Sequence, residues 1–227
     1  MQISVIIPVL NEADSIAQVL GAVPSMEGLE VVVVDGGSTD GSADIARSAG
    51  AVVLHEARPG YGRACASGSA AARGKILVFM DGDGADNPSY LPDLVAPLAQ
   101  NHADLVLASR LAGHLPAGAM PWHQRAGNRL ASGCINRLYH QSLTDLGPFR
   151  AVRRDDIDKL NMSEMTYGWP VEMMVKAARL GWRMVEVPVD YRPRLGGQSK
   201  ISGTLRGSLL AAYFILRTIA RYSGKPL

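Results

Sequence analysis

Short apolar runs alternate along the chain with segments whose apolar residues recur every three or four positions. The run Ile3–Val9 is followed by apolar residues at this wider spacing between Ile16 and Val23, and then by a second run at Val31–Val34. A continuous β-branched run is typical of a buried strand, and the wider spacing is typical of one face of a helix. The beginning of the chain therefore predicts a strand, a helix and a second strand.

The same alternation continues to the end of the chain. Further strands are predicted at Val52–Leu54, Ile76–Met80, Leu105–Ala108, Phe149–Val152 and Met184–Val189. Further helices are predicted at Ser42–Ser48, Ala64–Arg73, Leu91–Ala99, Trp122–Tyr139, Val171–Arg179 and Thr204–Tyr222. Because the strands are apolar throughout, the pattern favours a parallel sheet covered by helices on both faces. We therefore expect an α/β fold with a mostly parallel central sheet flanked by helices.

Composition and charge limit the classes of function. With 227 residues, 47% of them hydrophobic, the chain suits a single globular domain spanning residues 1–227. The formal net charge is only +2. A protein that binds nucleic acid through charge normally carries strongly clustered Lys and Arg, so nucleic acid is not expected as a partner.

Cysteine usage and hydropathy predict a cytoplasmic location. Cys65 and Cys134 form no CxxC pair and have no His at metal-ligand spacing, which favours a reducing compartment. The N-terminal residues turn polar after ten positions and lack the pattern of a secretion signal. The apolar run Leu209–Leu216 has eight residues, far fewer than the ~20 that span a bilayer.

Polar side chains follow the carboxyl ends of the predicted strands. They are Asn11 and Glu12, Asp35, Asp81 and Asp83, and Ser109 and Arg110. Ligands of open parallel sheets bind beyond these strand ends, so the side chains are expected to gather at one edge. The alternative for Asn11 is a helix cap, and for the segment that begins at Asp35 it is a plain turn.

The segment Asp81–Asp86, Asp-Gly-Asp-Gly-Ala-Asp, is the strongest chemical signal. Two carboxylates two residues apart can share a hard cation such as Mg²⁺ or Mn²⁺, and the glycines permit close approach of a ligand. An EF-hand is excluded because Asp86 and Pro92 stand where that motif needs Gly and Glu. The alternative is an acidic turn without a metal.

Two common nucleotide-binding motifs are absent. The first strand leads into Pro-Val-Leu-Asn-Glu rather than GxGxxG, and no GxxxxGK[ST] sequence occurs. A nucleotide would therefore be held by carboxylates, backbone groups and a metal.

Three ordered motifs resemble family 2 glycosyltransferases of the GT-A fold. They are VIIPVLNE at 5–12, VVDGGSTDGS at 33–42 and FMDGD at 79–83. The resemblance is greatest to synthases of polyprenyl-phosphate (dolichol-phosphate) sugars. It extends over nearly the whole chain through RPGYG at 58–62, ASR at 108–110, LTDLGPFR at 143–150 and GQSK at 197–200.

The resemblance implies a role for each matching position. It implies contacts with the nucleotide sugar for Pro8, Asn11, Glu12, Asp35, Asp81 and Arg192, a metal site at Asp81 and Asp83, and catalytic contacts with phosphates for Arg110 and Lys200. It also divides the chain into a nucleotide-sugar-binding half at 1–110, an acceptor-side half at 111–203 and a C-terminal amphipathic helix at 204–227.

Three positions depart from the family pattern. Gly36 stands where a second Asp is usual, and Ala85 replaces a Gln that often assists the metal, a role that Asp86 or water could take. Pro148 interrupts the usual Gly-Phe-Arg sequence on the acceptor side. The acceptor could therefore differ from dolichol phosphate.

The implied reaction is metal-dependent transfer of a sugar from a UDP- or GDP-sugar, with inversion, to a polyprenyl phosphate or another lipid-linked or small acceptor. An ionised phosphate acceptor needs no base, whereas a hydroxyl acceptor needs a carboxylate to take its proton. Asp145 is the first candidate for this catalytic role and Glu172 the second, and the alternative for Asp145 is an ion pair with Arg150 or a local cap. The competing function is a non-catalytic nucleotide-sugar-binding or scaffold subunit of a membrane glycosyltransferase complex.

Two helices carry basic residues that allow two interpretations. Arg125 and Arg129 lie four positions apart, so they could clamp an acceptor phosphate or simply face solvent. The predicted helix 204–222 mixes apolar residues with arginines, and it could rest on a membrane surface, dock on a membrane-protein partner or pack on its own sheet. Peripheral association with the inner face of the membrane would suit a lipid acceptor.

Overall fold

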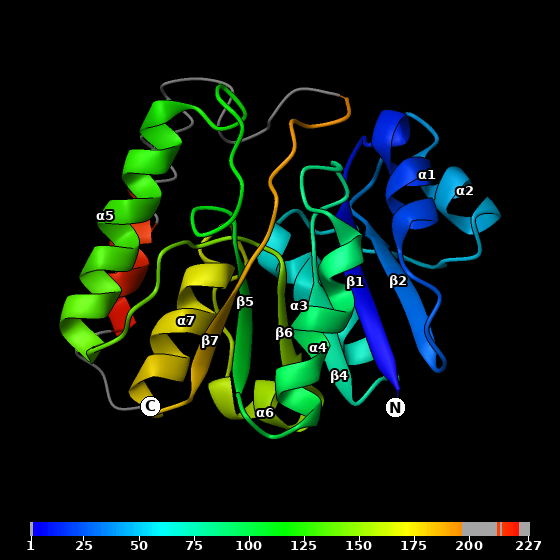
Figure 1. Cartoon of the computed structure of the whole chain (residues 1–227). Helices are drawn as coiled ribbons and strands as arrows, with labels where there is room; N and C mark the ends of the chain where they lie inside the picture. The colour runs from blue at the N-terminus through cyan, green and yellow to red at the C-terminus, as the bar shows by residue number, and fades with distance from the viewer. Residues whose placement is uncertain (1, 197–212, 214, 223–227) are drawn as a thin grey trace.

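The computed structural model of the chain describes residues 2–196, 213 and 215–222. Among them, seven strands form one sheet: β1 (Ile3–Val9), β2 (Leu29–Asp35), β3 (Val52–His55), β4 (Ile76–Phe79), β5 (Leu105–Ser109), β6 (Arg150–Arg153) and β7 (Met184–Pro188). Their order across the sheet is β3-β2-β1-β4-β6-β5-β7 (Figure 1). The expected α/β domain with a mostly parallel sheet is confirmed.

Strand β6 is the exception to the parallel arrangement. It pairs antiparallel with both β4 and β5, whereas the other neighbouring strands pair in parallel. Arg150, the first residue of β6, lies opposite Phe79 and Leu107, near the carboxyl ends of β4 and β5. The antiparallel direction therefore brings the segment before β6 to the edge of the sheet where its parallel neighbours end.

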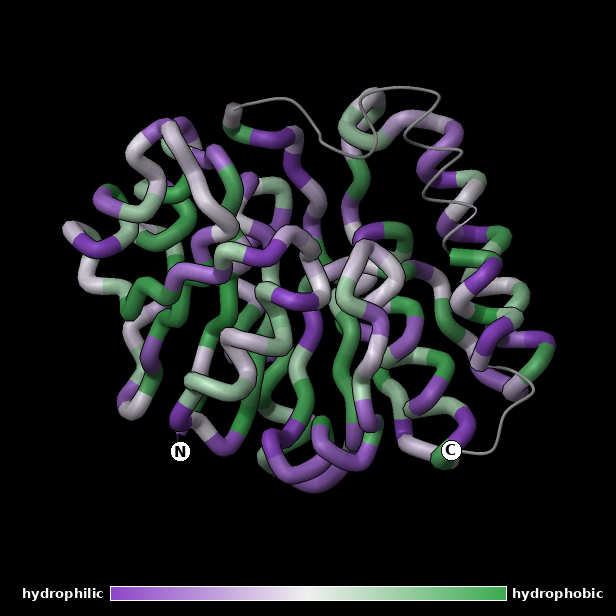
Figure 2. Tube along the Cα trace, turned by 180° about the vertical axis from the view of Figure 1, so that it is seen from behind, coloured by the Kyte–Doolittle hydropathy of each residue, from purple (hydrophilic) through white to green (hydrophobic). Residues whose placement is uncertain are grey.

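Helices cover both faces of the sheet. One apolar cluster joins the sheet to α1 (Ala13–Ala22), α2 (Ser42–Ser48) and α4 (Leu91–Ala99). A second cluster joins the opposite face to α3 (Tyr61–Ala71), α5 (Trp122–Tyr139) and α7 (Trp169–Arg179). Three short elements were not predicted, namely η1 (Pro88–Tyr90), α6 (Arg154–Ile157) and η2 (Asp158–Leu160). Figure 2 shows hydrophobic strands in the middle of the molecule and hydrophilic segments in the loops beyond them.

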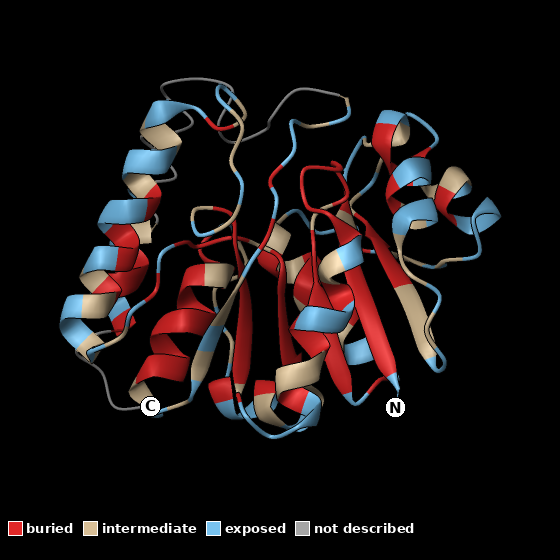
Figure 3. Cartoon of the chain, in the orientation of Figure 1, coloured by how far each residue is buried: buried red, intermediate tan, exposed pale blue. Residues whose placement is uncertain are grey.

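Burial follows from the alternation of side chains along each strand. In β1, Val5 and Ile7 belong to the cluster that contains α1, and Ile6 between them belongs to the cluster that contains α3. All three side chains are fully buried, because helices lie on both sides of the sheet. Figure 3 shows the same burial along the central strands, while the outer faces of α1, α2 and α5 are exposed.

Helix α3 approaches the sheet and α7 closely because small residues line it. A Cβ added at Gly68 would lie 2.5 Å from Cγ2 of Ile6 and 3.0 Å from Cγ2 of Val34. A Cβ at Gly62 would lie 2.8 Å from Cβ of Trp169 in α7. These positions have no room for a larger residue, and they fix the position of a helix that contributes Tyr61 and Ala64 to the cavity described below.

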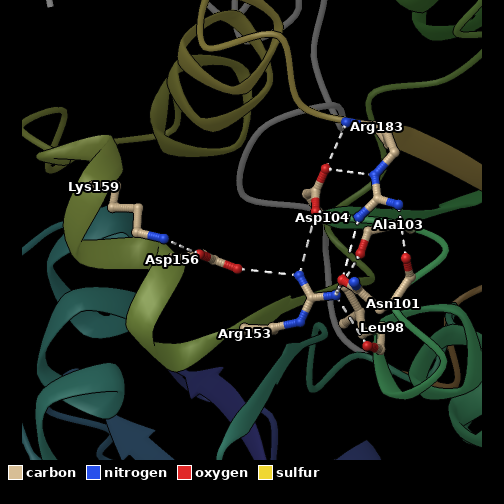
Figure 4. Close-up of polar contacts among 8 residues, drawn as sticks. All are labelled: Leu98, Asn101, Ala103, Asp104, Arg153, Asp156, Lys159 and Arg183. Atoms are coloured by element: carbon tan, nitrogen blue, oxygen red, sulfur yellow. Dashed lines mark hydrogen bonds and ion pairs between the residues drawn. The ribbon is translucent and has the colours of Figure 1, made fainter.

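An ion-pair network closes the edge of the sheet opposite the carboxyl ends of the parallel strands (Figure 4). Asp104 accepts hydrogen bonds from the side chain of Arg183, which immediately precedes β7, and from the side chain of Arg153, the last residue of β6. Arg153 also donates to the carbonyls of Leu98 and Ala103. The network therefore ties α4, β5, β6 and β7 together away from the cavity described below.

The described part of the C-terminal segment is helical and packs on the protein itself. Residues 213 and 215–222 are helical, while the rest of the predicted helix lies outside the described residues. Ile219 and Tyr222 are buried in the cluster that contains α7, and the hydroxyl groups of Tyr222 and Ser163 are 2.6 Å apart. Within the ranges described, no helix is long and apolar enough to cross a membrane.

Candidate active site

A cavity of about 730 Å³ opens at the carboxyl ends of the parallel strands. One wall, called the nucleotide-side wall after the half of the chain that the sequence predicts to bind the donor, comes from the ends of β1 to β4 and includes Pro8, Glu12, Gly36 and Glu56. The opposite wall is mixed: α5 contributes polar side chains such as His123 and Asn128, whereas apolar side chains come from Leu146 in the loop before β6 and from Pro170 and Val171 in α7. Arg110 lies between the two walls. The cavity therefore has the place and size of a ligand site in an open α/β sheet.

Three carboxylates line the middle of this cavity. Asp81, Asp83 and Asp86 all lie in the loop that follows β4, as the sequence predicts for the first two. Gly84 allows the loop to turn, because its φ of +77° lies in the left-handed region. The carboxylate of Asp83 also accepts a hydrogen bond from the backbone N–H of Ala85 through Oδ1, at 2.9 Å.

The carboxylates destabilise one another's charge. Burial raises the pKa of Asp81, and the charges of Asp83 and Asp86 raise it further. Burial likewise raises the pKa of Asp86, against the lowering effect of Arg110. Such a cluster is costly to hold ionised without a cation, and a bound cation would relieve the repulsion.

The donor set fits a cation that is bound together with a diphosphate. In the part of the chain that the structure describes, no group of three or more His, Cys, Asp or Glu residues is placed to hold a metal by itself. Asp81 and Asp83 offer carboxylate oxygens, which Mg²⁺ and Mn²⁺ prefer. Mg²⁺ is commonly held by one or two carboxylates plus substrate phosphates and water, so these residues suit a metal–diphosphate complex rather than a closed protein cage.

Arg194 lies among these carboxylates although the sequence interpretation did not select it. Its Nη1 is 2.8 Å from Oδ2 of Asp83, and its Nη2 is 3.0 Å from Oε1 of Glu12. The loop after β7 that carries Arg194 is bound to the loop after β4 by two backbone hydrogen bonds, from Leu195 N–H to the Asp83 carbonyl and from Arg192 N–H to the Ala85 carbonyl. The signal in the sequence was the basic loop itself, in which Arg192 was selected instead.

Arg110 is held in place by a buried ion pair with Asp145. Its Nε and Nη2 donate to the two oxygens of Asp145 at 2.7 and 2.9 Å, and Nη1 takes part in neither bond. Asn128 and the backbone N–H groups of Arg110 and Leu146 donate to the same carboxylate. Burial would raise the pKa of Asp145, but the charge and hydrogen bonds of Arg110 outweigh it and lower the pKa.

Glu172, the second candidate base, is not among the cavity-lining residues. Its carboxylate is buried and pairs with Lys176 at 2.8 Å. It also accepts hydrogen bonds from the N–H groups of Ser163 and Glu164. Burial would raise the pKa of Glu172, but these partners lower it. Asp145 and Glu172 are thus both fully engaged. Arg150, the ion-pair partner considered as the alternative role of Asp145, donates to backbone carbonyls instead.

The other residues selected from the sequence fall into two groups. Pro8 and Glu12 line the cavity. Asn11 and Asp35 lie beside it and shape the loop after β2, where the Asn11 side chain accepts from Thr39 N–H and Asp35 accepts from the N–H groups of Gly37 and Ser38.

Two basic residues of the late loop could not be placed in the cavity. The side chain of Arg192 is exposed and is not among the lining residues. Lys200 lies outside the described residues.

Sequence reasoning missed several other lining residues. Glu56 binds the side chains of Arg58 and Ser67, which lower its pKa. Tyr61, whose pKa is raised by burial and then by the charge of Asp81, stands beside the carboxylates. Tyr191 packs its ring 5.3 Å from the Arg110 guanidinium carbon. The RPGYG motif marks Arg58 and Tyr61, whereas no signal marks Tyr191.

Comparison with known proteins identifies the class of this site. The family model for glycosyl transferase family 2 matches residues 4–160. An uncharacterised glycosyltransferase of Mycobacterium tuberculosis is 40% identical over 211 residues, which cover 92% of this chain and 94% of that protein. An undecaprenyl-phosphate mannosyltransferase of Micrococcus luteus is 34% identical over 244 residues, 99% of this chain and 97% of the relative. The chain belongs to glycosyltransferase family 2.

Solved structures agree with this assignment. Glucosyl-3-phosphoglycerate synthase from Mycobacterium tuberculosis in complex with phosphoglyceric acid aligns with a TM-score of 0.78 at 25% identity, covering 100% of this chain and 81% of that one. The same enzyme with Mn²⁺, UDP and phosphoglyceric acid aligns with a TM-score of 0.77. The fold is GT-A, and the chain is a nucleotide-sugar-dependent glycosyltransferase.

Proposed function

We propose that the protein transfers a sugar with inversion from a UDP- or GDP-sugar to a phosphate-bearing acceptor, in the first place a polyprenyl phosphate, with Mg²⁺ or Mn²⁺ as cofactor. The observation that carries the proposal is the cavity in which a carboxylate cluster and the buried Arg110 meet, with apolar side chains such as Leu146 and Val171 in the wall beyond them. The Micrococcus relative is a polyprenyl-phosphate mannosyltransferase by name, which supports this acceptor.

The nucleotide-side wall would bind the donor. Asp81 and Asp83 would hold the cation, which would supply positive charge to stabilise the leaving diphosphate. Pro8, Glu12 and Gly36 provide the surface against which the nucleoside lies. Asp35 would support this wall through the hydrogen bonds that fix the loop after β2.

The opposite wall would bind the acceptor. Arg110 presents a guanidinium whose Nη1 is not used by Asp145, so this nitrogen can donate to an acceptor phosphate. The apolar side chains of Leu146, Val171 and Ile215 on this wall suit a hydrocarbon tail next to that phosphate. Arg192 and Lys200 remain proposals for phosphate contacts in the late loop.

The engagement of the two candidate bases favours an acceptor that arrives ionised. Asp145 accepts five hydrogen bonds, and Glu172 is bound to Lys176. Because the oxygens of both carboxylates are already engaged, neither carboxylate is suited to accept a proton from a hydroxyl group. A phosphate oxygen is already charged near neutral pH and attacks without a base. Asp145 therefore acts as the residue that positions Arg110.

A phosphoglycerate acceptor is the second candidate, because the aligned mycobacterial synthase is solved with phosphoglyceric acid. The test is an acceptor panel with purified full-length protein, Mn²⁺ and either UDP-glucose or GDP-mannose, read out as released UDP or GDP and labelled product. Undecaprenyl phosphate should stimulate turnover and phosphoglycerate should not. Stimulation by phosphoglycerate alone would reverse the assignment, and nucleotide binding without turnover of any pair would support a non-catalytic subunit.

A matched pair of variants tests the metal role. Asp83→Asn should lower turnover by roughly 100-fold or more, because a metal ligand that stabilises the leaving diphosphate is lost. Asp44→Asn, which removes an exposed carboxylate paired with Arg47 in α2, should leave turnover unchanged. Equal activities in the two variants, with both proteins folded by thermal melting, would contradict the role of Asp83.

A further inference from the structure

The guanidinium of Arg194 stands at one of the two Asp83 oxygens that could bind a metal. Asp83 uses Oδ1 to accept the backbone N–H of Ala85, and Oδ2 is the atom that Arg194 holds at 2.8 Å. A cation bound to Asp83 through Oδ2 and the Arg194 guanidinium at its observed position would compete for the same lone pairs. Both are positive, so they would also repel each other at this distance.

Arg194 is held there by carboxylates from two different loops. Its second nitrogen donates to Glu12, which follows β1, so the side chain bridges the nucleotide-side wall and the loop after β4. The side chain is 26% exposed, and the residues it contacts are 10% exposed in their side chains. The contact is therefore more than a solvated surface pair, which normally contributes little.

The guanidinium is nevertheless incompletely satisfied in this position. Its Nε is buried and has no hydrogen-bond partner among the described residues. An unpaired buried donor is costly, and a diphosphate oxygen beside it would supply the missing acceptor. In this position Arg194 provides the positive charge that the carboxylates need. A diphosphate oxygen would give its unpaired Nε a hydrogen-bond acceptor, which favours rotation of the side chain toward the diphosphate.

The backbone allows this change without moving the loop. Leu195 N–H and Arg192 N–H are bound to carbonyls of the loop after β4, on either side of Arg194. The Leu195 side chain also packs tightly against Gly84: a Cβ added at Gly84 would lie 2.4 Å from Cδ1 and 2.6 Å from Cγ of Leu195. Only the side chain of Arg194 has to rotate, because its neighbours anchor the chain on both sides.

We propose that Arg194 is a resident counter-cation of the donor site, which opposes binding of the divalent metal alone and yields Asp83 when the metal arrives with a nucleoside diphosphate. The guanidinium then pairs with the diphosphate oxygens. This inference rests on the proposed metal-dependent function. It predicts that metal and nucleotide bind with strong positive coupling, and that Arg194 is the origin of much of that coupling.

The test is Mn²⁺ binding without nucleotide, measured by the electron paramagnetic resonance signal of free Mn²⁺. Arg194→Gln should bind Mn²⁺ roughly fivefold or more tightly than the wild type, since a competing cation is removed. Arg47→Gln is the matched control: it removes the same charge from an exposed arginine of α2 that does not line the cavity, and it should change the Mn²⁺ affinity by less than about twofold. Arg194→Lys keeps the positive charge but loses the planar guanidinium with its two donor nitrogens. Its Mn²⁺ affinity should lie between those of the wild type and Arg194→Gln.

Repeating the titrations with UDP and with GDP completes the cycle. The factor by which the nucleotide tightens Mn²⁺ binding should be smaller in Arg194→Gln than in the wild type. Unchanged or weaker Mn²⁺ binding by folded Arg194→Gln would overturn the inference while leaving the proposed function intact, provided that the wild type binds Mn²⁺ with nucleotide. Absence of any nucleotide-dependent Mn²⁺ binding in the wild type would instead remove the proposed function.

Discussion

The surroundings of Asp145 decide what its carboxylate can do. It binds Arg110, which lines the cavity, and both of its oxygens accept hydrogen bonds. Its pKa is lower than the ordinary value of an aspartate although the residue is buried. A carboxylate with these properties remains ionised and orients its partner, because protonation would break a buried ion pair. The residue therefore contributes to the reaction by fixing the direction of the guanidinium.

This role predicts a specific kinetic signature for Asp145→Asn. The amide cannot accept from Arg110 in the same way, so Arg110 loosens and the KM for the phosphate acceptor rises by roughly tenfold or more. The affinity for the donor nucleotide, measured by calorimetry, should change little, because Asp145 is not among the cavity-lining residues. A loss confined to kcat at unchanged acceptor KM would point to proton transfer by Asp145 instead.

The residues of the site differ in how far the sequence could predict them. Pro8 lies near the end of β1, and Glu12 and the aspartates after β4 follow strand ends closely, so the positions of the strands place all of them. The pairing of Asp145 with Arg110 was not predictable, because the partners are 35 positions apart and meet through the fold. Arg194 was missed for a related reason: local pattern does not tell which arginine of a basic loop faces inward.

At the scale of elements, periodicity predicts which segments form better than it predicts where they begin or how they run. Helices α1, α3 and α7 begin two or three residues before the expected positions, because their first turns contain polar, glycine or proline residues that carry no apolar signal. The antiparallel direction of β6 was not visible either, since a buried strand shows the same continuous apolar run in both directions. Both helix starts and strand direction depend on tertiary contacts, which the local sequence pattern does not show.

The close approach of α3 to β1 predicts opposite effects for two glycine substitutions. Gly68→Ala should lower the free energy of unfolding by roughly 1–3 kcal/mol, because its Cβ would meet Ile6 at 2.5 Å in a packed core. Gly133→Ala on the exposed side of α5 meets nothing within 4 Å and should raise it by up to about 1 kcal/mol, since alanine favours the helix. Urea denaturation measures both, and equal effects would contradict the packing of α3.

The network around Asp104 predicts how stability depends on pH. Hydrogen bonds from Arg183, above all, lower the pKa of Asp104 against the effect of burial. A carboxylate with a depressed folded-state pKa contributes stability that is present above its unfolded pKa, near 4, and is lost as the pH falls through the folded value. Asp104→Asn should therefore reduce the free energy of unfolding by roughly 1–3 kcal/mol at pH 7.

The same comparison at low pH separates this effect from a packing defect. The difference between wild type and Asp104→Asn should shrink as the pH is lowered from 5 toward the folded pKa, because the wild-type carboxylate then becomes neutral as well. Asp44→Asn provides a control with an exposed ion pair, whose contribution is small at every pH. If the difference in the free energy of unfolding between wild type and Asp104→Asn stays constant down to acid pH, the charge of Asp104 does not stabilise the network that joins α4, β5, β6 and β7.

At the scale of the whole molecule, the wall of the cavity opposite the nucleotide side and the exposed face of α5 belong to the same side of the sheet. Residues of α5 line the cavity, and Trp122 at its beginning is 77% exposed. Helix α5 contains Arg125, Arg129 and Arg137 and no acidic residue, and all three arginines are exposed. An apolar and basic face beside the proposed acceptor wall suits an anionic membrane surface from which a lipid phosphate would be taken.

Peripheral membrane association can be tested with vesicles. The protein should sediment with vesicles that contain phosphatidylglycerol, bind phosphatidylcholine vesicles weakly, and dissociate as salt is raised. Arg129→Gln should weaken the partition roughly fivefold, because each basic residue near the surface contributes ~1 kcal/mol. Arg47→Gln, which removes an exposed arginine in α2 on the opposite face of the sheet, should have no such effect. If both variants bind alike, or if binding ignores the anionic lipid, the acceptor must reach the cavity by a route that does not involve α5.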